Sequence, residues 1–89
     1  MIKSVKTAKN EGDKRVNYYQ RLRDIREDND YKQETIAKIL QIEQTQYSRY
    51  ERGAQKMGID KYIKLAIFYN ISLDYLCGLT STPRKLYDR

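Results

Sequence analysis

The chain has 89 residues, which is enough for one small domain with a single core. It contains no histidine and one cysteine, Cys77, so an internal disulfide, a zinc site and most acid–base catalysis are excluded. The net charge of +6 favours a nucleic-acid partner, but residues 18–52 hold seven basic and seven acidic side chains, so the excess lies mostly in the terminal segments.

Residues 1–17 hold five basic side chains against two acidic ones and almost no aromatic residue, which predicts a flexible basic arm. The arm lacks the apolar run of a secretory signal. It either follows the DNA backbone, as basic arms do, or is simply disordered.

A first helix is predicted from Tyr18, because Leu22 and Ile25 repeat with Tyr18 and Asn29 at helical spacing. Leu22 and Ile25 are expected on its buried face. Residues 28–30 end this helix, since Asp and Asn favour turns.

Two short amphipathic helices follow, at about Lys32–Leu40 and Gln44–Arg52, with only three residues between them. Ala37 is the lone small residue of the first of these, where a crossing helix needs access to the backbone. Glycine and proline are absent from Gln33 to Arg52, and Gly53 ends the second helix. This is the layout of a helix-turn-helix, whose second helix enters the DNA major groove.

Residues 54–58 form a loop, and Gly58 caps a fourth helix over Ile59–Tyr69. Apolar side chains cover so much of this helix that it is expected at the centre of the bundle. The apolar stretch at 63–69 is interrupted by Lys64 and is too short to cross a membrane. We therefore expect a soluble, cytoplasmic protein with no membrane partner.

Asn70 is expected to end the fourth helix in a left-handed conformation. Ser72 then caps a short fifth helix whose Leu73 and Leu76 face inward, and Gly78 stops it. The prediction is an all-α, compact five-helix domain over residues 18–80, with the arm at 1–17 and a polar tail at 81–89.

The outward face of the Gln44–Arg52 helix presents hydrogen-bonding groups that can read bases: Gln44, Thr45, Gln46, Ser48 and Arg49. A Gln44 amide can pair with adenine N6 and N7, and the Thr45 methyl can meet that of thymine. Arg49 suits either guanine or a phosphate. Arg52 and Lys56, on either side of Gly53, are candidates for backbone contact, or else are solvated loop charges.

The segments RLRDIRED, QETIAKIL, QTQYSRYERG and KLAIFYNISLDYLCGLT, between about Leu22 and Leu79, resemble the phage repressor and Cro type of helix-turn-helix domain. This group is also called the xenobiotic-response-element family. The resemblance implies a lambda-repressor-like bundle. It also implies that Gln44 reads adenine while Gln33 braces it and meets a phosphate.

The same resemblance implies an ion pair between Arg26 and Glu51. The pair either orients the Arg26 guanidinium toward a phosphate or is purely structural. Three positions depart from the family pattern. Gln41 stands where the turn usually has glycine, so we expect the turn to close differently, and Lys32 and Glu43 replace the usual Ser or Thr caps.

The leading hypothesis is a sequence-specific regulator of transcription that binds double-stranded DNA, a repressor acting as a homodimer on a pseudo-palindromic operator. Tyr69 and Tyr75 lie at the end of the bundle where such domains often dimerise, although ordinary half-buried packing explains them equally. The alternative is a protein-interaction module on the same fold, such as an antitoxin or an anti-repressor partner.

Enzymatic activity has little support, because no nucleophile with a base and no phosphate-binding glycine loop is present. No cofactor, metal or small-molecule ligand is expected. The acidic residues at 27–30 lack the ligand spacing of a calcium loop. A protein partner remains possible as a regulator.

Overall fold

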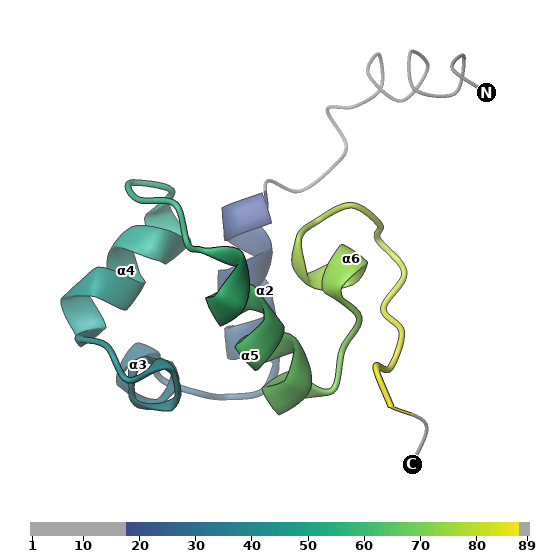
Figure 1. Cartoon of the computed structure of the whole chain (residues 1–89), viewed down its shortest axis with the longest axis horizontal. Coiled ribbons are helices and arrows are strands. Elements are labelled where there is room, and N and C mark those ends of the chain that lie inside the picture. Colours follow the sequence, from purple (N-terminus) through teal and green to yellow (C-terminus); the bar gives the residue numbers. More distant parts are fainter. Residues whose placement is uncertain (1–17, 88–89) are drawn as a thin grey trace.

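The computed structural model describes residues 18–87, so the predictions for the arm at 1–17 and for residues 88–89 lie outside it. Within this part the chain is all-helical, without strands (Figure 1). The helices are α2 (Tyr18–Asp28), α3 (Gln33–Leu40), α4 (Gln44–Arg52), α5 (Ile59–Tyr69) and α6 (Leu73–Leu76). The predicted all-α, five-helix fold is confirmed.

One hydrophobic core joins all five helices. Leu22 and Ile25 of α2 are buried in it, as their spacing predicts. Its other members are Ile36, Ala37, Leu40, Tyr47, Tyr50, Met57, Tyr62, Leu65, Ala66 and Leu76. The burial of Ala37 agrees with the expected close approach of another helix to α3, because α3 and α4 pack directly on each other.

The turn between α3 and α4 closes in the left-handed conformation, contrary to the expectation for a chain without glycine there. Gln41 has φ 60° and ψ 45°, and its N–H donates to the Lys38 carbonyl at 3.0 Å. The N–H of Ile42 donates to the Ala37 carbonyl, also at 3.0 Å. These two bonds satisfy carbonyls at the end of α3, and Ile42 packs against the core, which together offset the strain at Gln41.

The helix caps rely on the backbone rather than on side chains. Lys32 and Glu43 precede α3 and α4 in extended conformations, and neither side chain makes a capping hydrogen bond. Ser72 is the N-cap residue of α6, again without such a bond. Gly53 ends α4 with φ 75°, and a Cβ there would lie 2.8 Å from the Tyr19 ring, so both the backbone conformation and this approach favour glycine.

Helix α5 is not surrounded by the bundle, so its predicted central position is wrong. Tyr62, Leu65 and Ala66 are buried, whereas Ile59, Ile63 and Ile67 are 61%, 44% and 49% exposed. The two sets lie on neighbouring faces of the helix, whose centres are about 100° apart at 3.6 residues per turn. In a domain this small, one helix has too few neighbours to cover both of its sides.

Arg21 links α2 to α6 and to the following segment by hydrogen bonds, a role that the sequence analysis did not identify. Its Nη1 donates to the carbonyls of Tyr75, at 2.6 Å, and Thr80, at 3.2 Å. The guanidinium also lies 4.0 Å from the centre of the Tyr75 ring. The carbonyls and the ring face compensate the positive charge of this buried side chain.

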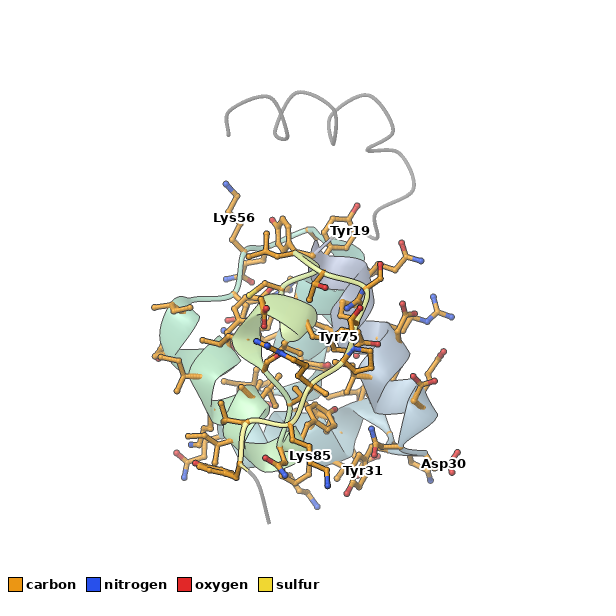
Figure 2. The ribbon with its side chains drawn as sticks, turned by 90° about the vertical axis from the view of Figure 1, so that its right-hand side faces the viewer. Tyr19, Asp30, Tyr31, Lys56, Tyr75 and Lys85 are labelled. Carbon is orange, nitrogen blue, oxygen red and sulfur yellow. The ribbon has the colours of Figure 1, made fainter. Side chains whose placement is uncertain are left out.

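The segment that follows α6 returns along the domain and is held by a backbone hydrogen bond and by a hydrogen bond to a side chain. The Ser72 N–H donates to the Arg84 carbonyl at 2.7 Å, and the Tyr87 N–H donates to Asn70 Oδ1 at 2.7 Å. In Figure 2 this segment crosses in front of α6, where Tyr75 lies, and reaches Lys85 near the end of the domain that carries Tyr31.

Candidate nucleic-acid interface

Helix α4 is amphipathic, and its buried side fixes the direction of its polar side. Tyr47 and Tyr50 are buried in the core and anchor the helix. Gln44, Thr45 and Arg49 are exposed on the outward side, so these three predicted base-contact residues stand together in solvent.

Two other predicted base-contact residues are partly occupied by contacts within α4. Gln46 Nε2 donates to the Tyr50 hydroxyl at 2.9 Å. Ser48 Oγ accepts a hydrogen bond of 3.4 Å from Arg52 Nε. Both side chains are half-buried, and they would have to exchange these partners to reach a base.

Arg26 and Glu51 form a bidentate ion pair between α2 and α4, at the positions that the family resemblance implies. Arg26 Nε lies 2.7 Å from Glu51 Oε2, and Arg26 Nη2 lies 3.1 Å from Oε1. Arg26 Nη1 also donates to the Tyr31 carbonyl at 2.9 Å. The paired side chains are 12% and 3% exposed, so the pair is well shielded from water.

A chain of amides extends this ion pair to the exposed start of α4. Gln33 Nε2 donates to Glu51 Oε1 at 2.9 Å, and Gln44 Nε2 donates to Gln33 Oε1 at 3.1 Å. Gln44 therefore keeps its carbonyl oxygen and its second N–H free of these contacts. An oxygen and an N–H on one amide are the acceptor and donor that adenine N6 and N7 require.

The network sets the charge state of its members. Burial alone would raise the pKa of Glu51, but hydrogen bonds, that from Arg26 foremost and that from Gln33 among them, outweigh it and lower the pKa. The hydrogen bond to Glu51 raises the pKa of Arg26. Glu51 is therefore a carboxylate at neutral pH, and it holds Arg26 and Gln33 in fixed orientations.

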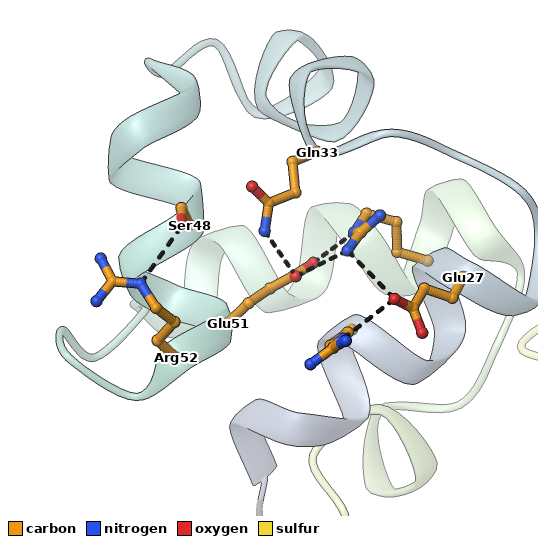
Figure 3. A pocket seen from close by; sticks show the side chains of 7 residues that line it. Glu27, Gln33, Ser48, Glu51 and Arg52 are labelled. Carbon is orange, nitrogen blue, oxygen red and sulfur yellow. Dashed lines mark hydrogen bonds and ion pairs between the residues drawn. The ribbon is translucent and has the colours of Figure 1, made fainter.

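A cavity of about 230 Å³ opens beside this network, between α2, the start of α3 and α4 (Figure 3). Its lining residues are Arg23, Arg26, Glu27, Gln33, Ser48, Glu51 and Arg52. Three guanidinium groups face two carboxylates there, and Arg23 is tied to Glu27 at 3.1 Å. Such a cavity has the size and charge to accept an anionic oxygen group.

Arg23 is a functional candidate that the sequence analysis missed. It stands three residues before Arg26, so the two side chains project from the same side of α2. That i, i+3 spacing was the available signal. Arg52 lines the same cavity, whereas Lys56 lies apart from it, in the exposed loop at the end of the domain near Tyr19 (Figure 2).

Every helix between residues 18 and 87 is too short or too polar to cross a bilayer. Within the same range, His, Cys, Asp and Glu side chains do not gather into a group of three that could hold a metal ion.

Comparisons with known proteins place these features in a family. A family model described as "Helix-turn-helix" matches residues 22–76, which include the whole network from Arg26 to Glu51. A solved structure described as a transcriptional regulator from Listeria innocua superposes with a TM-score of 0.67. The aligned region covers 83% of this chain and 68% of the Listeria chain. Because the sequence identity is 22%, this similarity supports the fold alone.

Two curated relatives come from Bacillus subtilis (strain 168). The uncharacterized HTH-type transcriptional regulator YobD is 36% identical over 72 residues, covering 81% of this chain and 64% of the relative. The HTH-type transcriptional regulator ImmR is 35% identical over 65 residues, covering 73% of this chain and 51% of that relative. The chain thus spans between half and two thirds of the length of these relatives. It belongs to the helix-turn-helix family of phage-repressor and Cro type, as its sequence motifs predict.

Proposed function

We propose that this chain is a sequence-specific DNA-binding regulator of transcription, in which α4 reads bases in the major groove. The observation that carries the proposal is the fixed amide of Gln44, held by Gln33 at the exposed end of a buried ion pair. A base-reading side chain that is oriented before binding loses little conformational entropy on contact. Both named relatives are described as transcriptional regulators, which agrees with this role.

In this proposal residues 18–80 are the DNA-binding unit. Gln44, Thr45 and Arg49 contact bases, and Gln46 and Ser48 join them after releasing their partners within α4. Arg26, Gln33, Arg52 and Lys56 contact the phosphate backbone. Arg23 is added to this second set because it lines the same cavity as Arg26 and Arg52.

The proposed mechanism is repression by occupancy. A homodimer would place two copies of α4 about 34 Å apart, on successive major-groove faces of a pseudo-palindromic operator. Selection of bound duplexes from a random pool tests this directly. A recovered site with two inverted halves supports the proposal, and failure to enrich any duplex contradicts it.

Gln44→Ala is expected to weaken binding to the selected duplex by about 1–3 kcal/mol and to leave binding to random DNA nearly unchanged. The reason is that a base contact adds affinity only on the cognate sequence. Isotherms on both duplexes measure the effect, with Gln55→Ala in the exposed loop as the matched glutamine control. Equal losses on the two duplexes would show that Gln44 does not read a base.

Arg23→Ala is expected to weaken binding to cognate and random DNA alike, because a phosphate contact carries no sequence information. If the protein neutralises about six phosphates, a plot of the logarithm of the binding constant against the logarithm of the salt concentration has a slope near −5. Loss of one phosphate contact in the variant should make this slope shallower by about 1. Arg84→Ala is the control, since the segment bearing Arg84 and α4 lie on opposite sides of the domain (Figure 1).

An unchanged slope for Arg23→Ala would remove this residue from the interface. A slope near zero for the unaltered protein would contradict DNA binding as a whole. It would favour the alternative, a protein-interaction module, which the near balance of charges in residues 18–52 and the exposed Glu43 beside α4 also favour.

A further inference from the structure

The outer side of α5 carries a strip of three isoleucines that the proposed DNA interface does not use. Ile59, Ile63 and Ile67 follow one another at intervals of four residues, so they lie in one row along the helix. Each is more than two fifths exposed. Figure 1 shows α5 in front of α2, and no other labelled helix covers its near side. Single exposed isoleucines are ordinary, but a continuous apolar strip marks an interaction surface.

We propose that this isoleucine strip is the surface through which two copies of the chain pair, with α5 antiparallel to α5 of the second copy. The inference deepens the proposed function, which needs two recognition helices, and rests on it to that extent. It names a surface that differs from the Tyr69 and Tyr75 end of the bundle, where the sequence analysis expected the dimer contact.

The strip matches itself under a two-fold axis. If the axis passes beside Ile63, the two Ile63 side chains meet each other. Ile59 and Ile67 each lie four residues from Ile63, about 6 Å along a helix that rises 1.5 Å per residue. Ile59 of one copy then faces Ile67 of the other, twice, so three apolar layers form without any gap.

The charges beside the strip fit the same arrangement. Asp60 and Lys64 are exposed on one flank of the strip, one residue after Ile59 and Ile63. A two-fold axis brings this flank of each helix against the same flank of the other. Measured along the helix axis, Asp60 of one copy then lies within about 3 Å of Lys64 of the second copy.

Neither charge has a strong competing partner. Asp60 approaches Lys61 at 4.0 Å, at the limit of an ion pair, and Lys64 has no ion pair within residues 18–87. The two tyrosines at the alternative surface are engaged by their own domain. The Tyr75 ring lies under Arg21, and the hydroxyl oxygen of Tyr69 is buried. The unpaired surface is therefore the α5 strip.

The first test replaces Ile63, at the predicted axis, with aspartate. Sedimentation equilibrium without DNA measures self-association from about ten micromolar to about one millimolar, since so short a face belongs to the small end of protein interfaces. We expect dimer for the unaltered protein, monomer for Ile63→Asp, and an unchanged far-ultraviolet circular dichroism spectrum because Ile63 is exposed. Leu79→Asp, at a leucine that is also exposed, is the matched control and should still dimerise.

The second test exchanges the flanking charges. Asp60→Lys and Lys64→Asp should each raise the dimer dissociation constant by about tenfold or more, because each puts like charges across the axis. The double variant Asp60→Lys with Lys64→Asp should recover the affinity of the unaltered protein. Recovery supports antiparallel self-pairing when the circular dichroism spectra of all three variants are unchanged, because Asp60 and Lys64 also lie one turn apart on the same helix.

Three outcomes overturn the inference: a monomer at every concentration, equal dimerisation by Ile63→Asp, or a double variant no better than the single ones. DNA binding is measured separately on the same proteins, by the selection of bound duplexes. A dimer that responds to these substitutions but selects no duplex would keep the α5 interface and remove the proposed function. A selected duplex that is bound only by monomers would keep DNA binding and remove the α5 interface.

Discussion

Leu65→Ala is expected to lower the free energy of unfolding by about 2–5 kcal/mol. Leu65 lies on the buried side of α5 with no exposed surface, in a core shared by all five helices. Removing its side chain loses the transfer free energy of three carbon atoms and leaves a cavity that the rigid neighbours fill only in part. Because small domains have a total stability of about 5–15 kcal/mol, this one substitution takes a large share of it.

Urea denaturation of dilute protein, followed by circular dichroism, measures the change. Ile63→Ala on the same helix is the matched control, with an expected cost below about 1 kcal/mol because Ile63 is exposed. Similar losses for the two variants would show that both sides of α5 are buried, and would restore the central position that the sequence pattern predicted for this helix.

Glu51→Ala is expected to cost about 3 kcal/mol, the lower end of the range for breaking a buried ion pair. It leaves the Arg26 guanidinium, which is largely shielded from water, without its bidentate acceptor, and it removes the acceptor of Gln33. Glu27→Ala is the control. Its carboxylate pairs with Arg23 at 3.1 Å and approaches Arg26 at 3.9 Å, on the surface of α2, where such pairs contribute about 1 kcal/mol or less.

The pH dependence gives a second measure of the same pair. The pKa of Glu51 is lower in the folded protein than its ordinary value of 4.5, so the unfolded chain binds a proton more readily. The stabilisation is therefore fully present above about pH 4.5 and is lost as the pH falls through the lowered pKa. Glu51→Gln should flatten this acid limb of the stability curve. If the loss of stability at acid pH is the same in this variant, the folded protein does not stabilise the charged form of Glu51.

In the proposed function a substitution at Glu51 also affects base recognition by Gln44, because the amide chain from Glu51 through Gln33 to Gln44 depends on that carboxylate. Loss of this carboxylate frees Gln33 to rotate, and Gln44 then loses its fixed acceptor. The structural role of the ion pair and the orientation toward DNA that we propose for Gln44 would thus be two consequences of one arrangement.

The turn at Gln41 shows where a local rule gives the wrong answer. Glycine is preferred at a left-handed position because other residues are strained there. Gln41 adopts that conformation nonetheless, since two backbone hydrogen bonds form and Ile42 reaches the core. The gain comes from the hydrogen bonds to the end of α3 and from the contact of Ile42 with the core, and a preference for single residues does not include these contacts.

The helices, the helix-turn-helix and the polar residues of α4 could be predicted from the sequence, because the spacing of apolar side chains and the turn residues are local properties of the chain. The tertiary structure decided which side of α5 is covered, that Arg21 fastens α6, and that Arg23 joins Arg26 and Arg52 around one cavity. These features depend on which helices lie next to one another. Periodicity gives the apolar side of a helix, but only packing in three dimensions determines how much of that side the neighbouring helices can cover.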